Sequence, residues 1–248
     1  MMRSLLYPRR MRMQRHGGIV NLISGPSSCN PVRIPGLKTN PKDQGVYETF
    51  DKGWASKNTL LVGGLGIAAP ARVSLEQVKG RAFAGFRLQG VDAIRFNGYR
   101  KEAVTMTGRL VLMLDRRACL VIDRFELEAP NQFESRFFTF AEVLKKRDAL
   151  VLRQENKKLD VSFAADKPGC LVFSQSAPVL PRDPVATMVR WCSTGLECSF
   201  TSAMLLVPGG VPGRVSVRAQ NSSRTAIAAS FARRAFRFVV SNRLALMA

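Results

Sequence analysis

Short apolar runs interrupted by glycine, proline, asparagine or aspartate recur along almost the whole chain, and long helical periodicity is nearly absent. Runs of this kind, bounded by turn-forming residues, are typical of the strands of β-sandwiches and barrels. We therefore expect an all-β protein with little helix. The runs that predict strands are Ile19–Ser24, Val46–Phe50, Thr59–Val62, Ala71–Val78, Ala82–Leu88, Ala93–Phe96, Val104–Leu114, Ala118–Glu126, Gln132–Phe140, Ala149–Gln154, Leu159–Ala164, Cys170–Ser174, Thr187–Trp191, Glu197–Leu206, Gly213–Ala219, Thr225–Ser230 and Phe236–Ser241.

Local patterns indicate how these strands pair and what they bury. Asp115–Arg117 separates two apolar runs and predicts a tight hairpin. Between Leu159 and Phe163 apolar residues alternate with polar ones, which indicates a strand with one buried face. Phe133, together with Arg136, Phe138 and Phe140, suggests an inner face rich in aromatic side chains. Together these patterns favour an antiparallel β-sandwich of two sheets.

The charge of the chain favours a polyanionic partner. Its 248 residues, enough for one β-rich domain or two small ones, include 38 Lys and Arg against 18 Asp and Glu, a formal net charge of +20. The excess lies largely at the two ends, since Met1–Arg15 contains no acidic residue and none follows Glu197. Candidate partners are nucleic acid, an anionic membrane surface and an acidic polysaccharide. Arg-rich ends that are solvated and bind nothing are the alternative.

Several kinds of chemistry lack the residues that they need. The five cysteines form no CxxC pair, so we expect free thiols rather than a zinc framework, with a Cys192–Cys198 disulfide as the alternative. The single histidine, His16, removes most histidine-based chemistry, and neither a dinucleotide-binding glycine loop nor a GxSxG motif is present. Asp123-Arg124 indicates a structural pair at a strand end rather than an acid/base dyad. No apolar run reaches the roughly 18 residues of a membrane span, and Met1–Arg15 lacks the apolar segment of a secretory signal.

Three stretches occur in an informative order. Trp54–Gly64 combines a polar Ser-Lys-Asn-Thr step, an apolar run and two glycines, which indicates a buried strand entering a turn. Asp92–Tyr99 follows, and Arg109–Leu114 with Ala118–Arg124 then forms an apolar hairpin. Over roughly residues 15–210, this order resembles the C-terminal β-sandwich of heparinase II/III-like polysaccharide lyases. In that family a His-Asn-Thr element precedes the first of these strands.

The resemblance implies a supersandwich-like β-domain from a lyase that acts on uronic-acid polysaccharides. In the β-elimination that it implies, a base removes the proton beside the carboxylate while a neighbouring group neutralises that carboxylate. Tyr or His acts as the base or acid, Asn, Arg or His neutralises the carboxylate, and most of these residues lie on a helical toroid domain. No such domain is recognisable in this sequence, so we expect a fragment or degenerate member that does not catalyse alone.

The resemblance also implies a domain organisation and a partner. It gives a basic N-terminal tail at residues 1–15, the β-sandwich at 16–210, and basic C-terminal strands or a tail of the same domain at 211–248. The implied partner is an acidic polysaccharide of the heparan sulfate or alginate class. A missing helical toroid domain is a candidate second partner, and no cofactor is expected. Two other functions remain open: a non-catalytic module that binds acidic polysaccharide, and a non-specific nucleic-acid-binding protein suggested by charge alone.

The family motifs map onto few candidate site residues in this sequence. His16 is the candidate catalytic residue, since it lies upstream of the Asn-Thr element, and a lone histidine in a basic tail is the alternative. Lys57 occupies the position of a metal-ligating histidine of the family, and because a protonated lysine repels a divalent cation we expect no metal site. The candidates for substrate binding are Lys57, Asn58, Arg95 and Arg100. Solvation of Lys57 and a local backbone bond of Asn58 are the alternatives.

Overall fold

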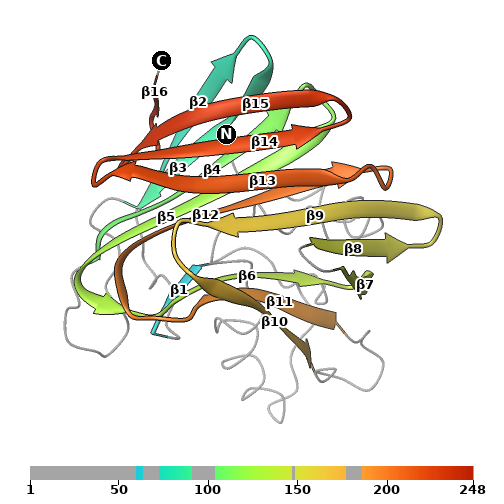
Figure 1. Ribbon diagram of the computed structural model, residues 1–248, viewed down its shortest axis with the longest axis horizontal. Helices are drawn as coiled ribbons and strands as arrows, with labels where there is room; N and C mark the ends of the chain where they lie inside the picture. The colour runs from blue at the N-terminus through green and yellow to red at the C-terminus, as the bar shows by residue number, and fades with distance from the viewer. Residues whose placement is uncertain (1–59, 64–72, 91–103, 147–148, 177–185, 248) are drawn as a thin grey trace, which may run out of the picture.

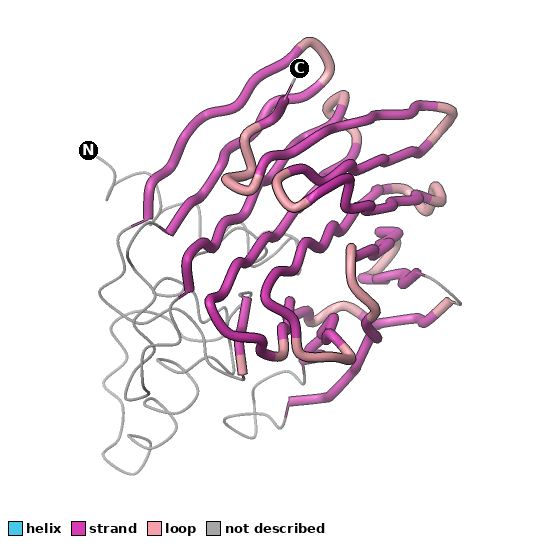
Figure 2. Tube along the Cα trace, turned by 60° about the vertical axis from the view of Figure 1, so that its left-hand side comes forward, coloured by secondary structure: helices cyan, strands magenta, loops and turns pink. Residues whose placement is uncertain are grey.

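A computed structural model describes residues 60–63, 73–90, 104–146, 149–176 and 186–247. Within these residues the chain forms strands, turns and loops without any helix, as Figure 2 shows. The strands build antiparallel sheets of four, eight and four strands. The all-β antiparallel fold predicted from the sequence is therefore confirmed. No helix of the described chain has the length and apolar character needed to cross a membrane.

The largest sheet, which we call sheet B, has eight strands in the order β2-β3-β4-β5-β12-β9-β8-β7. Its long central strands are β4, β5 and β12, and the shorter ones flank them on either side (Figure 1). Its strands are β2 (Val73–Gly80), β3 (Phe83–Gly90), β4 (Val104–Leu114), β5 (Ala118–Asn131), β7 (Glu142–Lys145), β8 (Ala149–Gln154), β9 (Lys157–Ala165) and β12 (Glu197–Pro208).

Two smaller sheets of four strands complete the fold. Sheet A has the order β1-β6-β11-β10, and sheet C has the order β13-β14-β15-β16. Sheet A contains β1 (Leu60–Val62), β6 (Phe133–Thr139), β10 (Gly169–Ser176) and β11 (Ala186–Ser193). Sheet C contains β13 (Gly213–Asn221), β14 (Arg224–Phe231), β15 (Arg234–Ser241) and β16 (Leu246–Met247).

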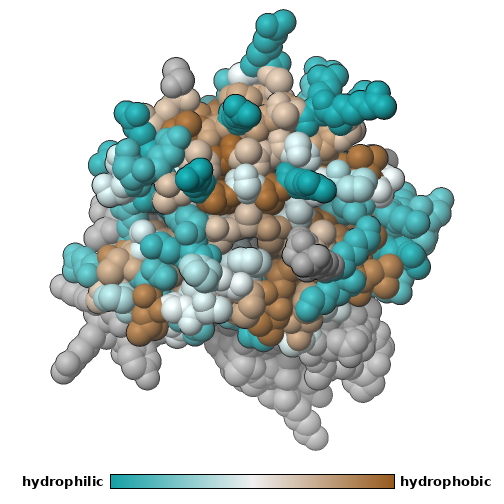
Figure 3. All heavy atoms as spheres, in the orientation of Figure 1, coloured by the Kyte–Doolittle hydropathy of each residue, from teal (hydrophilic) through white to brown (hydrophobic). Residues whose placement is uncertain are grey.

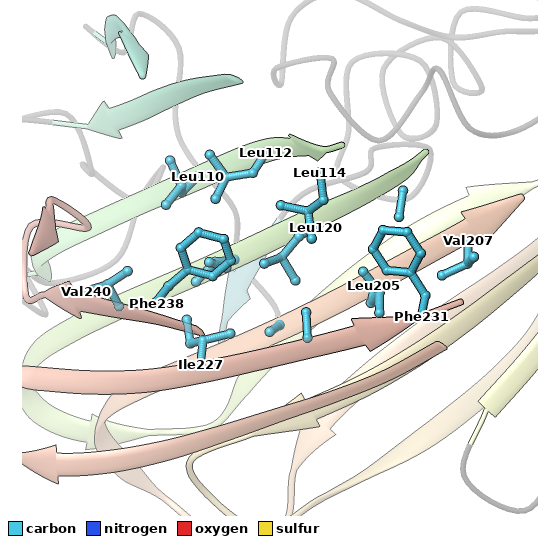
Figure 4. Close-up of a cluster of buried hydrophobic side chains, with 14 of the residues drawn as sticks. Leu110, Leu112, Leu114, Leu120, Leu205, Val207, Ile227, Phe231, Phe238 and Val240 are labelled. Atoms are coloured by element: carbon cyan, nitrogen blue, oxygen red, sulfur yellow. The ribbon is translucent and has the colours of Figure 1, made fainter. Parts of the chain in front are cut away.

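Sheet B forms the middle layer, because its two faces contribute to different hydrophobic clusters. On one face, Leu110, Leu112 and Leu120 pack in a single buried cluster with Ile227 and Phe238 of sheet C, as Figure 4 shows. Each of these five side chains is at most 8% exposed. This cluster holds sheet C against the middle layer.

The opposite face of sheet B packs against sheet A. Val111 and Val121, which alternate with the residues that face sheet C, pack in a second cluster with Phe137 of β6 and Val189 of β11. A third cluster joins the same two sheets around Phe133. The described residues thus form a three-layer sandwich, in which sheet B separates the two outer sheets.

The sequence predicted two sheets, and the structure has three. The difference has a physical signature in β4 and β12, where Leu110–Leu114 and Ala203–Val207 are continuous apolar runs rather than alternating ones. The sequence of a strand that is covered on both faces is a continuous apolar run of this kind. These strands belong to a middle layer, and alternation could predict only the strands that bury a single face.

The predicted hairpin at Asp115–Arg117 is confirmed. Asp115 and Arg116 have φ values of 50° and 57°, and the Arg117 backbone N–H donates to the Leu114 carbonyl oxygen at 2.9 Å. Positive φ at both central residues is the geometry of the two-residue turns that match the twist of paired strands. This turn joins β4 to β5, two central strands of sheet B.

Asp123 and Arg124 do not form the pair at a strand end that the sequence suggested. Strand β5 continues to Asn131, so both residues lie within the strand and point to opposite faces. Asp123 pairs with Arg109, whereas the Arg124 guanidinium is 2.5 Å from Glu126. Both residues have structural contacts, but each pairs with another residue rather than with its neighbour.

The aromatic run of β6 is also divided between two faces. Phe133 packs against Phe125 and Phe200 of sheet B, with ring centroids 5.2 Å and 5.3 Å away. Phe138 instead belongs to a separate cluster and meets Phe140 edge to face at 5.4 Å. The prediction of one aromatic inner face was therefore wrong, since odd- and even-numbered side chains of a strand point in opposite directions.

Gly85 of β3 lies so close to β4 that a side chain has no room. A Cβ atom there would lie 1.8 Å from the backbone oxygen of Val111 and 3.0 Å from the Cα atom of Leu112. We expect Gly85→Ala to lower the free energy of unfolding by about 1–3 kcal/mol, the usual cost of overpacking. Gly195→Ala is the control, because its Cβ would meet its nearest neighbour at 3.6 Å. Urea denaturation measures both variants, and equal midpoints would show that β3 can shift away from β4 at little cost.

Candidate functional site

The site candidates from the sequence lie outside the described part of the chain. This holds for His16, Lys57, Asn58, Arg95 and Arg100, so their roles stay predictions. The three tyrosines of the sequence also lie outside it, and the described residues therefore include neither histidine nor tyrosine. These are the two residue types that the family resemblance implies as acid or base. A site built from described residues alone must work through other groups.

Three charged side chains gather on the face of sheet A that is turned away from sheet B. Glu134 and Arg136 lie two residues apart on β6 and so share a face. Arg190 of β11 lies directly opposite Arg136. Phe137, which follows Arg136, packs toward sheet B, and this places the charged residues on the other side. We call Glu134, Arg136 and Arg190 the charged cluster.

The two arginines of the charged cluster share one carboxylate unequally. Arg136 Nε donates to Glu134 Oε1 at 2.6 Å, whereas Arg190 Nη1 is 3.9 Å from Glu134 Oε2. Like charges directly opposite each other on a sheet repel, so Glu134 offsets a repulsion between the two guanidinium groups. The Nε atom of Arg190 is buried and has no hydrogen-bond partner in the described structure. The 3.9 Å separation of Nη1 from Glu134 is too long for a hydrogen bond, so the partly exposed end of the Arg190 guanidinium can donate to an anionic group.

A buried ion pair fixes β6, the strand that carries two members of the charged cluster, over sheet B. Asp123 of β5 accepts hydrogen bonds from Arg109 Nε at 2.6 Å and from Arg109 Nη2 at 3.0 Å. The Ser135 hydroxyl of β6 donates to the same carboxylate at 3.1 Å. Ser135 lies between Glu134 and Arg136, so this bond ties the cluster to the middle layer.

Two of the described cysteines, Cys119 and Cys192, are poor nucleophiles. Cys192 lies opposite both Glu134 and Cys170 in the strand register. Burial, and then the neighbouring Glu134 carboxylate, raises the pKa of the Cys192 thiol, and burial raises the pKa of Cys119 to about 11. The thiolate is the reactive form, so neither residue suits covalent catalysis near neutral pH. Both are free thiols, as are Cys170 and Cys198.

Sequence reasoning missed the charged cluster because its members lie far apart in the chain. Glu134-Ser135-Arg136 carries a local signal, since charges two residues apart on a strand share a face. Arg190 joins them only through the pairing of β6 with β11. No group of three or more His, Cys, Asp or Glu side chains in the described ranges is placed to hold a metal ion. The chemistry that this arrangement offers is the binding of anions.

The sequence matches no protein family model and no curated protein. The fold, however, is similar to those of solved polysaccharide lyases. A heparinase III structure aligns with a TM-score of 0.63 and 8% identity, over 84% of this chain and 33% of its own. A mutant of the heparan sulfate lyase HepC from Pedobacter heparinus gives a TM-score of 0.60 with 11% identity, over 83% of this chain and 33% of its own. Another heparinase III gives 0.56 with 12% identity, over 74% and 29%.

These matches place the chain in a structural class: it has the fold of a β-domain found in heparinase III-type lyases. The resemblance predicted from the sequence is thereby confirmed at the level of the fold. The chain spans about a third of the length of the solved structures that it matches. Those proteins therefore contain further domains, and their activity belongs to chains about three times as long.

Proposed function

We propose that this chain is the β-sandwich part of a polysaccharide lyase that acts by β-elimination on uronic-acid polymers, and that this part binds the polymer without cleaving it alone. The observation that carries the proposal is the fold, which matches heparinase III structures over 74–84% of this chain but only 29–33% of theirs. A net charge of +20 suits an acidic polymer as the ligand.

The charged cluster supplies a chemical role within this proposal. β-Elimination requires a group that neutralises the carboxylate next to the acidic proton, and a guanidinium group does this with two parallel hydrogen bonds. Arg190 is the most exposed member of the cluster, because its side chain is 30% exposed whereas those of Glu134 and Arg136 are 16% and 13% exposed. Its role is to bind a uronate carboxylate, and the acid or base comes from residues outside the described part or from another domain.

The purified chain is expected to bind alginate and heparan sulfate but to release no unsaturated uronic product from either. Ultraviolet absorbance of the product measures cleavage, and calorimetry measures binding. Because a hydrogen bond to a charged group contributes about 1.5–3 kcal/mol, Arg190→Gln should weaken alginate binding roughly tenfold or more. Arg153→Gln is the matched control, since Arg153 lies on β8 of sheet B and forms only an exposed pair with Glu142.

Two outcomes would contradict this function. Product formation that disappears in His16→Ala would show that the chain is catalytic alone. Equal alginate affinity of Arg190→Gln and Arg153→Gln would remove the charged cluster from the binding site. A non-catalytic polysaccharide-binding module is the alternative function, and it predicts that addition of a helical lyase domain leaves the chain without activity.

A further inference from the structure

The outer face of sheet C, turned away from sheet B, is an arginine surface without acidic residues. From Cys198 to Ala248 the sequence contains seven arginines and no Lys, Asp or Glu. Four of these arginines point outward from three adjacent strands, because they alternate with residues that pack against sheet B. They are Arg214 and Arg218 of β13, Arg224 of β14 and Arg237 of β15. We call them the arginine face.

The strand register spreads the arginine face evenly. Rows of cross-strand partners succeed one another about every 6.6–6.8 Å along the strands. Each row contains one arginine, and small or aliphatic residues fill the rest. The rows are Arg214–Ser230–Ala235, Ser216–Ala228–Arg237, Arg218–Ala226–Val239 and Arg224–Ser241. Figure 3 shows hydrophilic side chains standing apart over β13–β15 on a floor of more hydrophobic residues.

The arginine face is open and its charges are uncompensated. All four side chains are exposed, and so is Ala228, which lies on β14 within the sheet. None of the four forms an ion pair with a described residue. Arg234, by contrast, lies on the face of β15 that is turned toward sheet B, and its side chain is 2.7 Å from Asp115 of the β4–β5 turn.

Protection of a sheet edge does not explain this arrangement. Charged residues on edge strands prevent unwanted strand pairing, and β13 is an edge strand of sheet C. Arg224, however, lies on β14 and has a paired residue on both sides, Asn221 of β13 and Ser241 of β15. Its outward charge protects no edge, whereas Arg237 lies on β15 beyond Val239 and Val240, the two residues that pair with β16.

The chemistry of the arginine face favours an anionic polysaccharide over nucleic acid. Arginine binds sulfate, carboxylate and phosphate through a planar fork, whereas lysine acts as a point charge. Surfaces for single-stranded nucleic acid add aromatic side chains on which bases stack. No aromatic residue belongs to the outward rows, because Phe231, Phe236 and Phe238 pack toward sheet B. A flat floor of alanine and serine suits a linear chain of sugar rings.

We propose that the arginine face is a binding site for an anionic polysaccharide, separate from the charged cluster on the opposite side of the molecule. This proposal rests on the proposed function in one respect, the class of polymer that the arginine face binds. Its role would be to hold a distal part of a long polymer, so that a second segment reaches the charged cluster at a raised effective concentration.

The test compares two variants of the full chain that each remove four positive charges. One is Arg214→Gln/Arg218→Gln/Arg224→Gln/Arg237→Gln. The matched control neutralises exposed basic residues elsewhere and is Arg81→Gln/Arg116→Gln/Arg117→Gln/Lys157→Gln. Because four charge-assisted contacts are lost, we expect the first variant to bind heparan sulfate at least about tenfold more weakly than the control variant. Titrations with heparan sulfate, alginate and single-stranded DNA over a salt series compare a polymer with sulfate and carboxylate groups, one with carboxylate groups alone and one with phosphate groups.

Each outcome decides the proposal. Equal affinity of the two variants for both polysaccharides would overturn it. Equal losses for DNA and polysaccharide, fully restored when lysine replaces the four arginines, would reveal a non-specific polyanion surface and would also overturn it. Should the fourfold variant fail to fold, Arg218→Gln and Arg237→Gln give the same comparison singly against Arg81→Gln. Loss of alginate binding in Arg190→Gln with an unaffected arginine-face variant would refute this site and leave the proposed function intact.

Discussion

Asp123→Ala is expected to lower the free energy of unfolding by about 3–5 kcal/mol, the usual effect of removing one partner of a buried ion pair. The Asp123 side chain is 5% exposed and the Arg109 side chain 13%. Burial alone would lower the pKa of Arg109, but the charge of Asp123 and the hydrogen bonds to it outweigh burial and raise that pKa. Arg109 therefore stays charged, and the variant leaves a buried guanidinium group without this carboxylate.

Chemical denaturation of three further variants tests the cause of this loss. Glu142→Ala removes the exposed pair with Arg153, in which the side chains are 56% and 45% exposed, and should change stability by less than about 1 kcal/mol. Ser135→Ala removes only the hydroxyl donor to Asp123 and should cost about 1 kcal/mol. The double variant Arg109→Leu/Asp123→Leu removes both charges and should regain much of the loss. If Asp123→Ala is no less stable than Glu142→Ala, the buried pair does not contribute to the stability of the fold.

Most strands of the described ranges were predictable from the sequence, but the layers were not. The predicted strands Ile19–Ser24, Val46–Phe50 and Ala93–Phe96 lie outside the described residues and stay predictions. Runs such as Ala149–Gln154 and Gly213–Ala219 correspond closely to β8 and β13, because turn residues bound them on both sides. β7 at Glu142–Lys145 and β16 at Leu246–Met247 escaped prediction, since neither is an apolar run that turn residues bound on both sides, as Leu60–Val62 of β1 is by Asn58 and Gly63. The position of sheet B between two other sheets depends on long-range pairing, which periodicity does not encode.

The candidate site shows the same division between local and long-range information. The sequence supplied His16 and Lys57 through family resemblance, and both lie outside the described residues. The charged cluster forms only when β11 places Arg190 opposite Arg136. The sequence showed that the C-terminal end of the chain is basic and free of acidic residues. Only the register of β13–β15 shows which of its arginines share the arginine face.

Phe133→Ala, as a single substitution, should lower the free energy of unfolding by about 3–5 kcal/mol, the usual range for deletion of a buried aromatic ring. Phe133 is 0% exposed, and its ring lies between those of Phe125 and Phe200 of sheet B. Phe231→Ala is the matched variant, because Phe231 is 3% exposed and stacks on Phe236 at 5.6 Å in the other core.

The two phenylalanine variants should loosen different layers, because sheet B separates the cores that they occupy. Hydrogen exchange in Phe133→Ala should accelerate first in β6, β10 and β11, and in Phe231→Ala first in β13–β15. Uniform acceleration in both variants would show instead that the three sheets open as a single unit. The binding sites follow the same division. Phe133→Ala should weaken alginate binding at the charged cluster of sheet A, while the arginine face of sheet C keeps its affinity for heparan sulfate.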